Sequence, residues 1–114
     1  MDVTRAIKVI QLAAYGSNLG DNANIVGLRA MLSANLGGNV AYTDWEMVDY
    51  SWGLDTYDQA DIDRVNAHDL LIIGGGGFFE IIPETDCWTG SRIAIPYDLF
   101  RKIRVPIVFH GVGI

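Results

Sequence analysis

The chain has 114 residues, half of them hydrophobic and 19% charged, which suits one globular domain with a buried core and argues against disorder. Its formal net charge is −6 and it has no basic run, which argues against nucleic acid as a partner.

A single cysteine, Cys87, excludes an internal disulfide and fits a reducing compartment. The apolar segments of the sequence are too short to span a bilayer, so it predicts no membrane span. Residues 7–14 follow Arg5 but are too short and too polar for a signal peptide, which makes a cytoplasmic location the expectation.

The first half of the chain predicts a strand, a helix and a second strand. Residues 7–14 form the first strand and residues 15–20 a polar, glycine-bearing loop. Asp21 or Asn22 then caps a helix that ends at Gly37-Gly38. The apolar positions of this helix recur at helical spacing: Ile25, Leu28, Leu32 and Leu36. Residues 40–44 form the second strand, which residues 47–50 extend or follow as another strand.

The second half continues the alternation of helix and strand. Asp58 caps a helix that runs to residue 65, and residues 70–73 form an apolar strand. A loop at 79–89 leads to a helix at 94–104, with Pro96 in its first turn, and to a last strand at 106–110. Strands that alternate with helices predict an α/β fold, with a Rossmann-like parallel sheet flanked by helices.

Four consecutive glycines follow the apolar strand Leu70–Ile73, and they are the most informative feature of the sequence. Glycines leave bare backbone with free φ and ψ angles. At the carboxyl end of a parallel strand, this allows main-chain N–H groups to close around an anion or a sugar–phosphate. The simpler interpretation is that the glycines only permit a tight turn.

Two further glycine-bearing loops end at the same edge of the predicted sheet. One follows the first strand, where Asp21 either caps the helix or binds a sugar hydroxyl. The other follows the last strand. The candidate ligand-binding residues on the three loops are Gly16, Ser17, Asn18, Gly20, Asp21, Gly74, Gly75, Gly76, Gly77, His110 and Gly111.

The sequence lacks the patterns that would indicate a cofactor or a metal. The loops carry neither a Gly-x-Gly-x-x-Gly fingerprint nor a P-loop, and we interpret the acidic start of the 58–65 helix as a solvated helix terminus. Asp44 stands where a ribose-binding acid would, but an ordinary strand residue is the simpler interpretation. We expect a structural role for His68. His110 is either an acid–base group or a hydrogen-bonded residue at the strand end.

Two aromatic residues leave a similar choice open. Trp88 and Tyr97 are candidates for the lining of a sugar site, and packing in the core is the alternative.

Three segments of the sequence together resemble the polysaccharide pyruvyl transferase family. They are Tyr15-Gly16-Ser17-Asn18-Leu19-Gly20-Asp21, then residues 69–78 with their glycine run, and finally residues 106–114. Their order and spacing are similar to the amino-terminal half of that family, over nearly the whole chain. The combination of Asn-x-Gly-Asp with a strand followed by Gly-Gly-Gly carries the resemblance.

The resemblance implies the first Rossmann-like lobe of a two-lobed, glycosyltransferase-B-like enzyme of exopolysaccharide biosynthesis. Such transferases move a pyruvyl group from phosphoenolpyruvate to a sugar of a surface polysaccharide. Basic and histidine residues of the second lobe handle phosphoenolpyruvate, while the glycine loops help to hold the acceptor sugar or nucleotide-sugar. The residues that match the family pattern are Asn18, Gly20, Asp21, Gly74, Gly75 and Gly76. The resemblance assigns no catalytic residue to this chain.

The end of the sequence suggests an incomplete sheet. It stops after an apolar strand, where another glycine loop begins. We therefore expect residues 1–114 to be a single domain, the amino-terminal lobe of a longer protein that is inactive alone, or a chain that forms homo-oligomers through its open sheet edge. The alternative function is a non-catalytic Rossmann-like module that binds a nucleotide or nucleotide-sugar.

Overall fold

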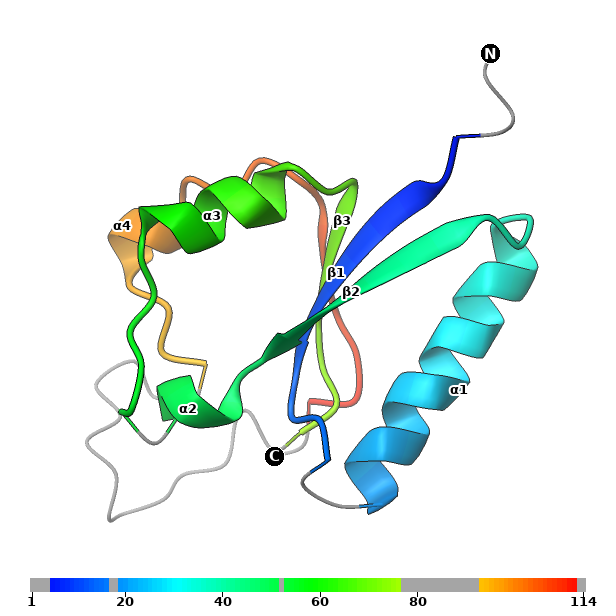
Figure 1. The fold of residues 1–114 in the computed structure, drawn as a ribbon, viewed down its shortest axis with the longest axis horizontal. Helices are drawn as coiled ribbons and strands as arrows, with labels where there is room; N and C mark the ends of the chain where they lie inside the picture. Colours follow the sequence, from blue (N-terminus) through cyan, green and yellow to red (C-terminus); the bar gives the residue numbers. More distant parts are fainter. Residues whose placement is uncertain (1–4, 17–18, 52, 77–92, 113–114) are drawn as a thin grey trace.

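Parallel strands in the order β2-β1-β3-β4 form the sheet at the centre of the molecule (Figure 1). The structure is a computed structural model, and it describes residues 5–16, 19–51, 53–76 and 93–112. The strands are β1 (Ile7–Ala13), β2 (Val40–Glu46), β3 (Leu70–Ile73) and β4 (Ile107–Phe109). All three pairings of neighbouring strands are parallel, which confirms the predicted α/β sheet.

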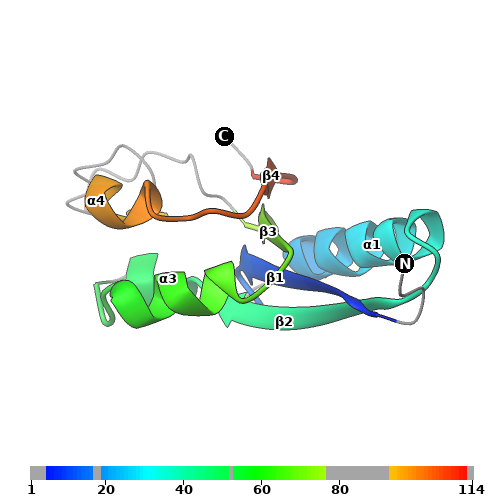
Figure 2. The ribbon, with the colours of Figure 1, turned by 90° about the horizontal axis from the view of Figure 1, so that it is seen from above.

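Helices cover both faces of this sheet, as Figure 2 shows from above. Helix α1 (Leu19–Asn35) lies on one face, and α2 (Val48–Ser51), α3 (Gln59–Asn66) and α4 (Tyr97–Phe100) lie on the other. Side chains of a strand alternate between the two faces. In β3, Leu71 and Ile73 therefore pack in the cluster on the α3 and α4 side, while Ile72 packs against Leu28 of α1.

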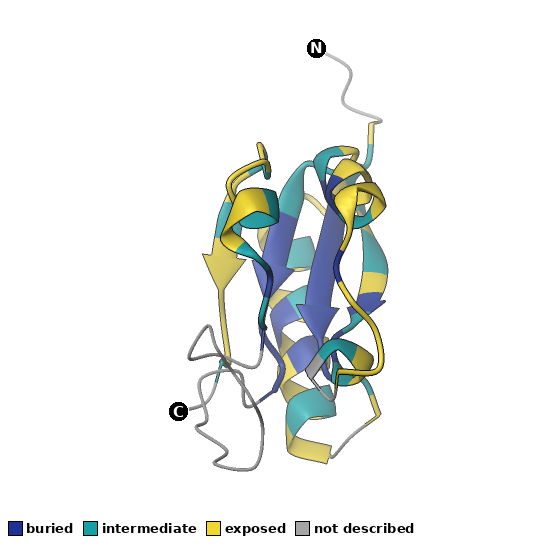
Figure 3. Ribbon diagram, turned by 90° about the vertical axis from the view of Figure 1, so that its left-hand side faces the viewer, coloured by how far each residue is buried: buried dark blue, intermediate teal, exposed yellow. Residues whose placement is uncertain are grey.

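Burial falls from the centre of the sheet to its β4 edge. Figure 3 shows β1 and β3 as the buried centre and β4 as largely exposed. In β4, Val108 and Phe109 are 43% and 48% exposed. Within the described residues β4 pairs with β3 alone, so its outer edge has no partner strand there.

The amino-terminal half differs from the prediction at two helix starts. Helix α1 begins at Leu19, so Asp21 and Asn22 lie inside its first turns and are not its caps. The side chain of Asn22 instead accepts a hydrogen bond from the Gly16 amide at 3.0 Å. Strand β2 runs to Glu46, and a carboxylate oxygen of Glu46 accepts from the Val48 amide at 3.3 Å. The chain therefore turns into helix α2 there, and the predicted strand at 47–50 is wrong.

The carboxyl-terminal half differs in one element. Strand β3 matches the prediction, and Asp58 is the N-cap of α3 as expected. The helix predicted at 94–104 is reduced to the four residues of α4, with Pro96 as N-cap. After α4 the chain is held by Asn66 of α3, whose side chain donates to the Lys102 carbonyl at 3.0 Å and accepts from the Arg104 amide at 2.7 Å.

Candidate functional site

The strand order places a topological switch point between β1 and β3. The chain leaves β1 to build β2 on one side, then crosses to build β3 and β4 on the other side. In open parallel sheets of this kind, ligands bind outside the carboxyl ends of the strands at that point. The loops after β1 and β3 are therefore the place to look for a site.

Backbone hydrogen bonds join the loops that follow β1, β3 and β4. The Ala14 amide donates to the Gly75 carbonyl at 3.0 Å, and the Gly75 amide donates to the Gly111 carbonyl at 3.2 Å. A Cβ added at Gly111 would lie 3.5 Å from the side chain of Asn24 in α1, so this helix is close to the loop after β4. The described parts of the three loops thus meet at one edge beside the amino-terminal part of α1, as a parallel sheet predicts.

The described part of the glycine run, Gly74–Gly76, is bonded within the chain. The amides of Gly74, Gly75 and Gly76 donate to the carbonyls of Leu12 and Gly111, and the three residues are buried. The expectation that these amides would close around an anion is therefore wrong for Gly74–Gly76. Gly77, Ser17 and Asn18 lie outside the described residues, as do Cys87 and Trp88.

Close packing explains two of the glycines. A Cβ on Gly74 would lie 1.5 Å from the carbonyl oxygen of His110. Gly75 has a φ of +101°, and a Cβ there would lie 2.7 Å from the side chain of Ile25. Glycine is needed at both positions because β4 and α1 approach the loop so closely.

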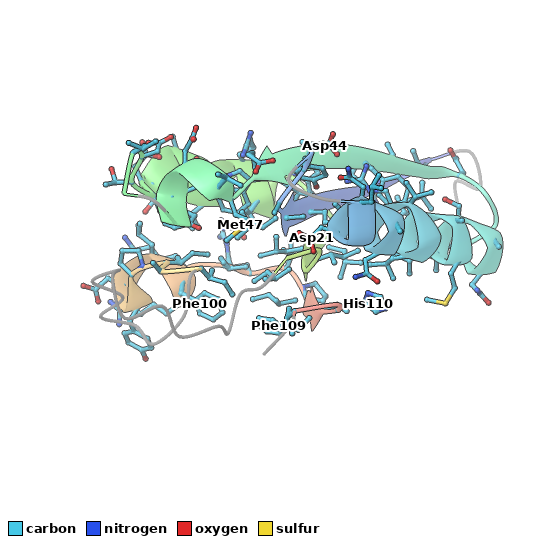
Figure 4. The ribbon with its side chains drawn as sticks, turned by 90° about the horizontal axis from the view of Figure 1, so that it is seen from below. Asp21, Asp44, Met47, Phe100, Phe109 and His110 are labelled. Carbon is cyan, nitrogen blue, oxygen red and sulfur yellow. The ribbon has the colours of Figure 1, made fainter. Side chains whose placement is uncertain are left out.

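The accessible part of the site consists of the loop after β1, the start of α1 and the loop after β4. Gly16, Gly20, His110 and Gly111 are exposed, and Asp21 is half-buried. Figure 4 looks onto this edge and shows Asp21 and His110 on it, on different elements. The His110 amide donates to the Ile73 carbonyl at 3.0 Å, so its backbone is a regular part of the sheet. Between these loops, a ligand would meet glycine backbone, the Asp21 carboxylate and the His110 imidazole.

Acidic groups dominate the charge at this edge. Asp21 lies in the first turn of α1, Glu46 ends β2 and Asp49 follows in α2. One basic group of the described residues lies beneath the loop after β1: the Arg29 guanidinium, which is paired there with Asp44. The other basic residues of the described part lie elsewhere: Arg5 and Lys8 at the amino end of β1, Arg64 near the end of α3, and Arg101, Lys102 and Arg104 before β4. The edge thus repels anions more than neutral ligands.

A polar network beneath the loops was not predicted from the sequence. Gln11 of β1 is 1% exposed, and its amide donates to the Gly74 carbonyl at 3.1 Å while its oxygen accepts from Arg29 at 3.0 Å. Arg29 also donates to the hydroxyl of Tyr15 at 3.0 Å and to Asp44 at 2.7 Å. The sequence signal that could have predicted this network is Gln11 itself, a polar residue within the otherwise apolar strand Val9-Ile10-Gln11-Leu12.

Burial raises the pKa of Tyr15 to about 12, an effect that the nearby guanidinium of Arg29 partly offsets. The Tyr15 hydroxyl therefore stays protonated at neutral pH. It donates to the Gln11 carbonyl at 2.6 Å. Asp44 accepts from Arg29 in this network. It lies within β2, two residues before the strand ends at Glu46, as an ordinary strand residue.

The other residues singled out in the sequence lie away from the loops. His68 precedes β3, and both of its ring nitrogens are hydrogen-bonded at 2.8 Å, to the Arg64 carbonyl and the Thr43 hydroxyl. These bonds agree with the structural role expected for it. Tyr97 is 72% exposed, which rules out the core-packing interpretation for that residue.

The search for metal sites and membrane spans adds two findings on the described residues. His, Cys, Asp and Glu side chains do not gather there in groups of three or more that could hold a metal ion. Helices in the same part of the chain are too short or too polar to cross a bilayer.

Comparisons with known proteins give no family assignment: no family model, no curated protein and no solved structure matches the chain.

Proposed function

We propose that this chain is the amino-terminal, Rossmann-like lobe of a pyruvyl transferase-like enzyme with glycosyltransferase-B-like architecture. Its role is to hold the sugar that accepts the pyruvyl group of phosphoenolpyruvate. The observation that carries this proposal is the meeting of the loops after β1, β3 and β4 at one edge, at the switch point of a parallel sheet. These are the segments in which the sequence resembles the transferase family.

The charge at the edge supports a neutral acceptor there. Phosphoenolpyruvate is strongly anionic, and its handling needs cationic groups. Asp21, Glu46 and Asp49 give this edge the opposite character. Carboxylates accept hydrogen bonds from sugar hydroxyls, as acidic residues do for the ribose of bound nucleotides. The anionic donor is thus assigned to basic groups of a second lobe, and the isolated chain is expected to be inactive.

The accessible residues of the site carry the contacts in this proposal. Asp21 accepts from sugar hydroxyls, while Gly16, Gly20 and Gly111 let the sugar approach the backbone, and His110 is a further donor or acceptor. Gly74, Gly75 and Gly76 act indirectly, because they allow the loops to pack together beneath the sugar.

One observation favours the alternative of a nucleotide-binding module. The amino-terminal end of α1 lies at the switch point, where helix termini bind phosphates in many α/β proteins. The acidic residues of the edge count against a phosphate at that place.

A nuclear magnetic resonance titration of the 114-residue chain tests the proposal. N-acetylglucosamine, galactose and mannose are added in turn, and then phosphoenolpyruvate and uridine diphosphate. We expect at least one sugar to shift the amide signals of Gly16, Gly20 and Gly111, with no shift from phosphoenolpyruvate. Shifts caused by uridine diphosphate and by none of the sugars would favour the nucleotide-binding module instead.

Two variants and an activity assay sharpen this test. Asp21→Asn is expected to weaken sugar binding, whereas the matched control Asp98→Asn, in the first turn of α4, leaves it unchanged. Consumption of phosphoenolpyruvate by the isolated chain would contradict the assignment of its handling to a second lobe.

A further inference from the structure

Gln11 is a buried polar residue at the centre of an apolar sheet. It lies in β1, between strands β2 and β3, and its neighbours Ile10 and Leu12 are fully buried. A leucine or methionine would fill such a position without the desolvation of an amide group. The glutamine therefore calls for a role other than filling space.

Both polar atoms of the Gln11 side-chain amide are hydrogen-bonded, and one of them bonds the glycine loop. Its Nε2 donates to the carbonyl of Gly74, the first peptide after β3, at 3.1 Å. Its Oε1 accepts from Nε of Arg29 in α1 at 3.0 Å. The amide group thus connects the loop after β3 to the helix that begins at the candidate site.

Arg29 extends this connection to the loop after β1. Its side chain is 21% exposed, and its Nη2 donates to the Tyr15 hydroxyl at 3.0 Å and to Asp44 Oδ1 at 2.7 Å. The guanidinium lies over the ring of Tyr42, 4.9 Å from its centroid. An arginine that is held on several sides in this way has one preferred position. Arg29 thus holds Tyr15, the residue at which the loop after β1 begins.

We propose that Gln11 and Arg29 are positioning residues that hold the loops after β1 and β3 in register and so preorganise the site for its sugar. The inference rests on the proposed function for the identity of the ligand. Neither side chain touches the sugar. Each acts through the peptide or hydroxyl that it holds, in the way that supporting residues orient the groups of a binding site.

The first test compares Gln11→Met with Gln59→Met by nuclear magnetic resonance. Gln59 is a matched control, because the nitrogen and the oxygen of its amide group are also hydrogen-bonded, to Asp63 and Lys102, at an exposed position of α3. In the ligand-free chain, we expect Gln11→Met to shift the amide signals of Gly75 and Gly76 and to speed their hydrogen exchange. Gln59→Met leaves both unchanged. A folded Gln11→Met chain with wild-type glycine signals and exchange rates would overturn the proposal.

Arg29→Lys provides a second variant in case Gln11→Met does not fold. Lysine keeps the charge near Asp44 but loses the planar fork that serves Gln11 and Tyr15 together. We expect the signals of Tyr15 and Gly75 to shift in this variant. Unchanged signals for both residues would contradict the proposal.

Sugar binding provides the second readout and separates the two proposals. Affinity for N-acetylglucosamine, galactose or mannose is expected to fall by about tenfold or more in Gln11→Met, as when supporting residues of other sites are removed. An altered loop with unchanged affinity for a bound sugar would overturn the role in preorganisation. If none of the sugars binds the wild-type chain while the glycine signals move as expected, the positioning role stands and the proposed sugar function fails.

Discussion

At the scale of single residues, the glycines divide into those that the packing requires and those that it does not. Gly74 faces the His110 carbonyl so closely that a Cβ would overlap it, at 1.5 Å. Gly27, in the middle of α1, has no atom within 4 Å of the place where a Cβ would lie. The same substitution by alanine should therefore have opposite effects at the two positions.

Gly74→Ala is expected to lower the free energy of unfolding by about 3 kcal/mol or more, because either β3 or β4 must move to make room. Gly27→Ala should raise it by about 0.5–1 kcal/mol, since alanine loses less backbone entropy in a helix. Urea denaturation of both variants gives the two values. A Gly74→Ala chain as stable as the wild type would show that the loop adapts easily.

Tyr15 should make stability depend on alkaline pH. The folded-state pKa is raised from 10.0 to about 12, mainly by burial, so the unfolded chain releases this proton first. The contribution of Tyr15 is fully present below pH 10 and is lost as pH rises toward pH 12. The difference in unfolding free energy between the wild type and Tyr15→Phe should therefore shrink over that interval. A constant difference across it would contradict the raised pKa.

At the scale of elements, α3 has the best-defined beginning. The Asp58 side chain accepts from the Asp61 amide and the Asp61 side chain accepts from the Asp58 amide, both at 3.0 Å. This reciprocal capping box satisfies two backbone donors that the helix leaves open.

Asp58→Ala is expected to lower the free energy of unfolding by about 1 kcal/mol, because a capping side chain is lost. Asp63→Ala is the control: it removes one negative charge as Asp58→Ala does, but the Asp63 carboxylate accepts from the Gln59 side chain and takes no part in the capping box. Thermal unfolding of the two variants should separate the cap from the charge. Equal losses would mean that the helix start gains nothing from the cap.

Elements with a local signal were predicted well, and those fixed by distant contacts were not. The cap Asp58 and the apolar run Leu70–Ile73 gave the bounds of α3 and β3 within one residue. The helix predicted at 94–104 is shorter, because residues 94–96 are not helical, with a φ of +52° at Ala94. After the end of α4, the chain bonds to Asn66, far away in the sequence, through the Lys102 carbonyl and the Arg104 amide. A hydrogen bond between residues so far apart in the sequence cannot be predicted from a local sequence pattern.

The candidate site shows the same division. The positions of the loops followed from the parallel sheet, so Gly16, Asp21 and His110 could be placed at one edge from the sequence. The hydrogen-bond partners of the glycine amides could not be predicted from the sequence. The Gly75 and Gly76 amides bond Gly111 only because the loop after β4 folds back onto them. The network of Gln11 and Arg29 also joins residues of separate elements.

At the scale of the whole molecule, protection should fall across the sheet from β1 to β4. Strand β1 is paired on both sides and its central residues are fully buried. Strand β4 is three residues long and largely exposed. Regions with few buried contacts open locally without unfolding of the whole chain.

Hydrogen exchange measures this gradient. We expect the amides of Ile107–Phe109 to exchange at least about tenfold faster than those of Ile10–Leu12, a difference of about 1.4 kcal/mol in opening free energy. Equal rates under native conditions would mean that the sheet opens only as one unit. Strong protection of β4 that grows with protein concentration would support the homo-oligomer through the sheet edge, which stays a prediction.

The place of β1 in the sheet has a consequence for the growing polypeptide. Both strands that flank β1 are synthesised after it, first Val40–Glu46 and then Leu70–Ile73. Strand β1 therefore leaves the ribosome before both of its partner strands, and Val9, Ile10 and Leu12 stay uncovered until those strands are made. During translation, these apolar residues are where a chaperone would be expected to bind the nascent chain.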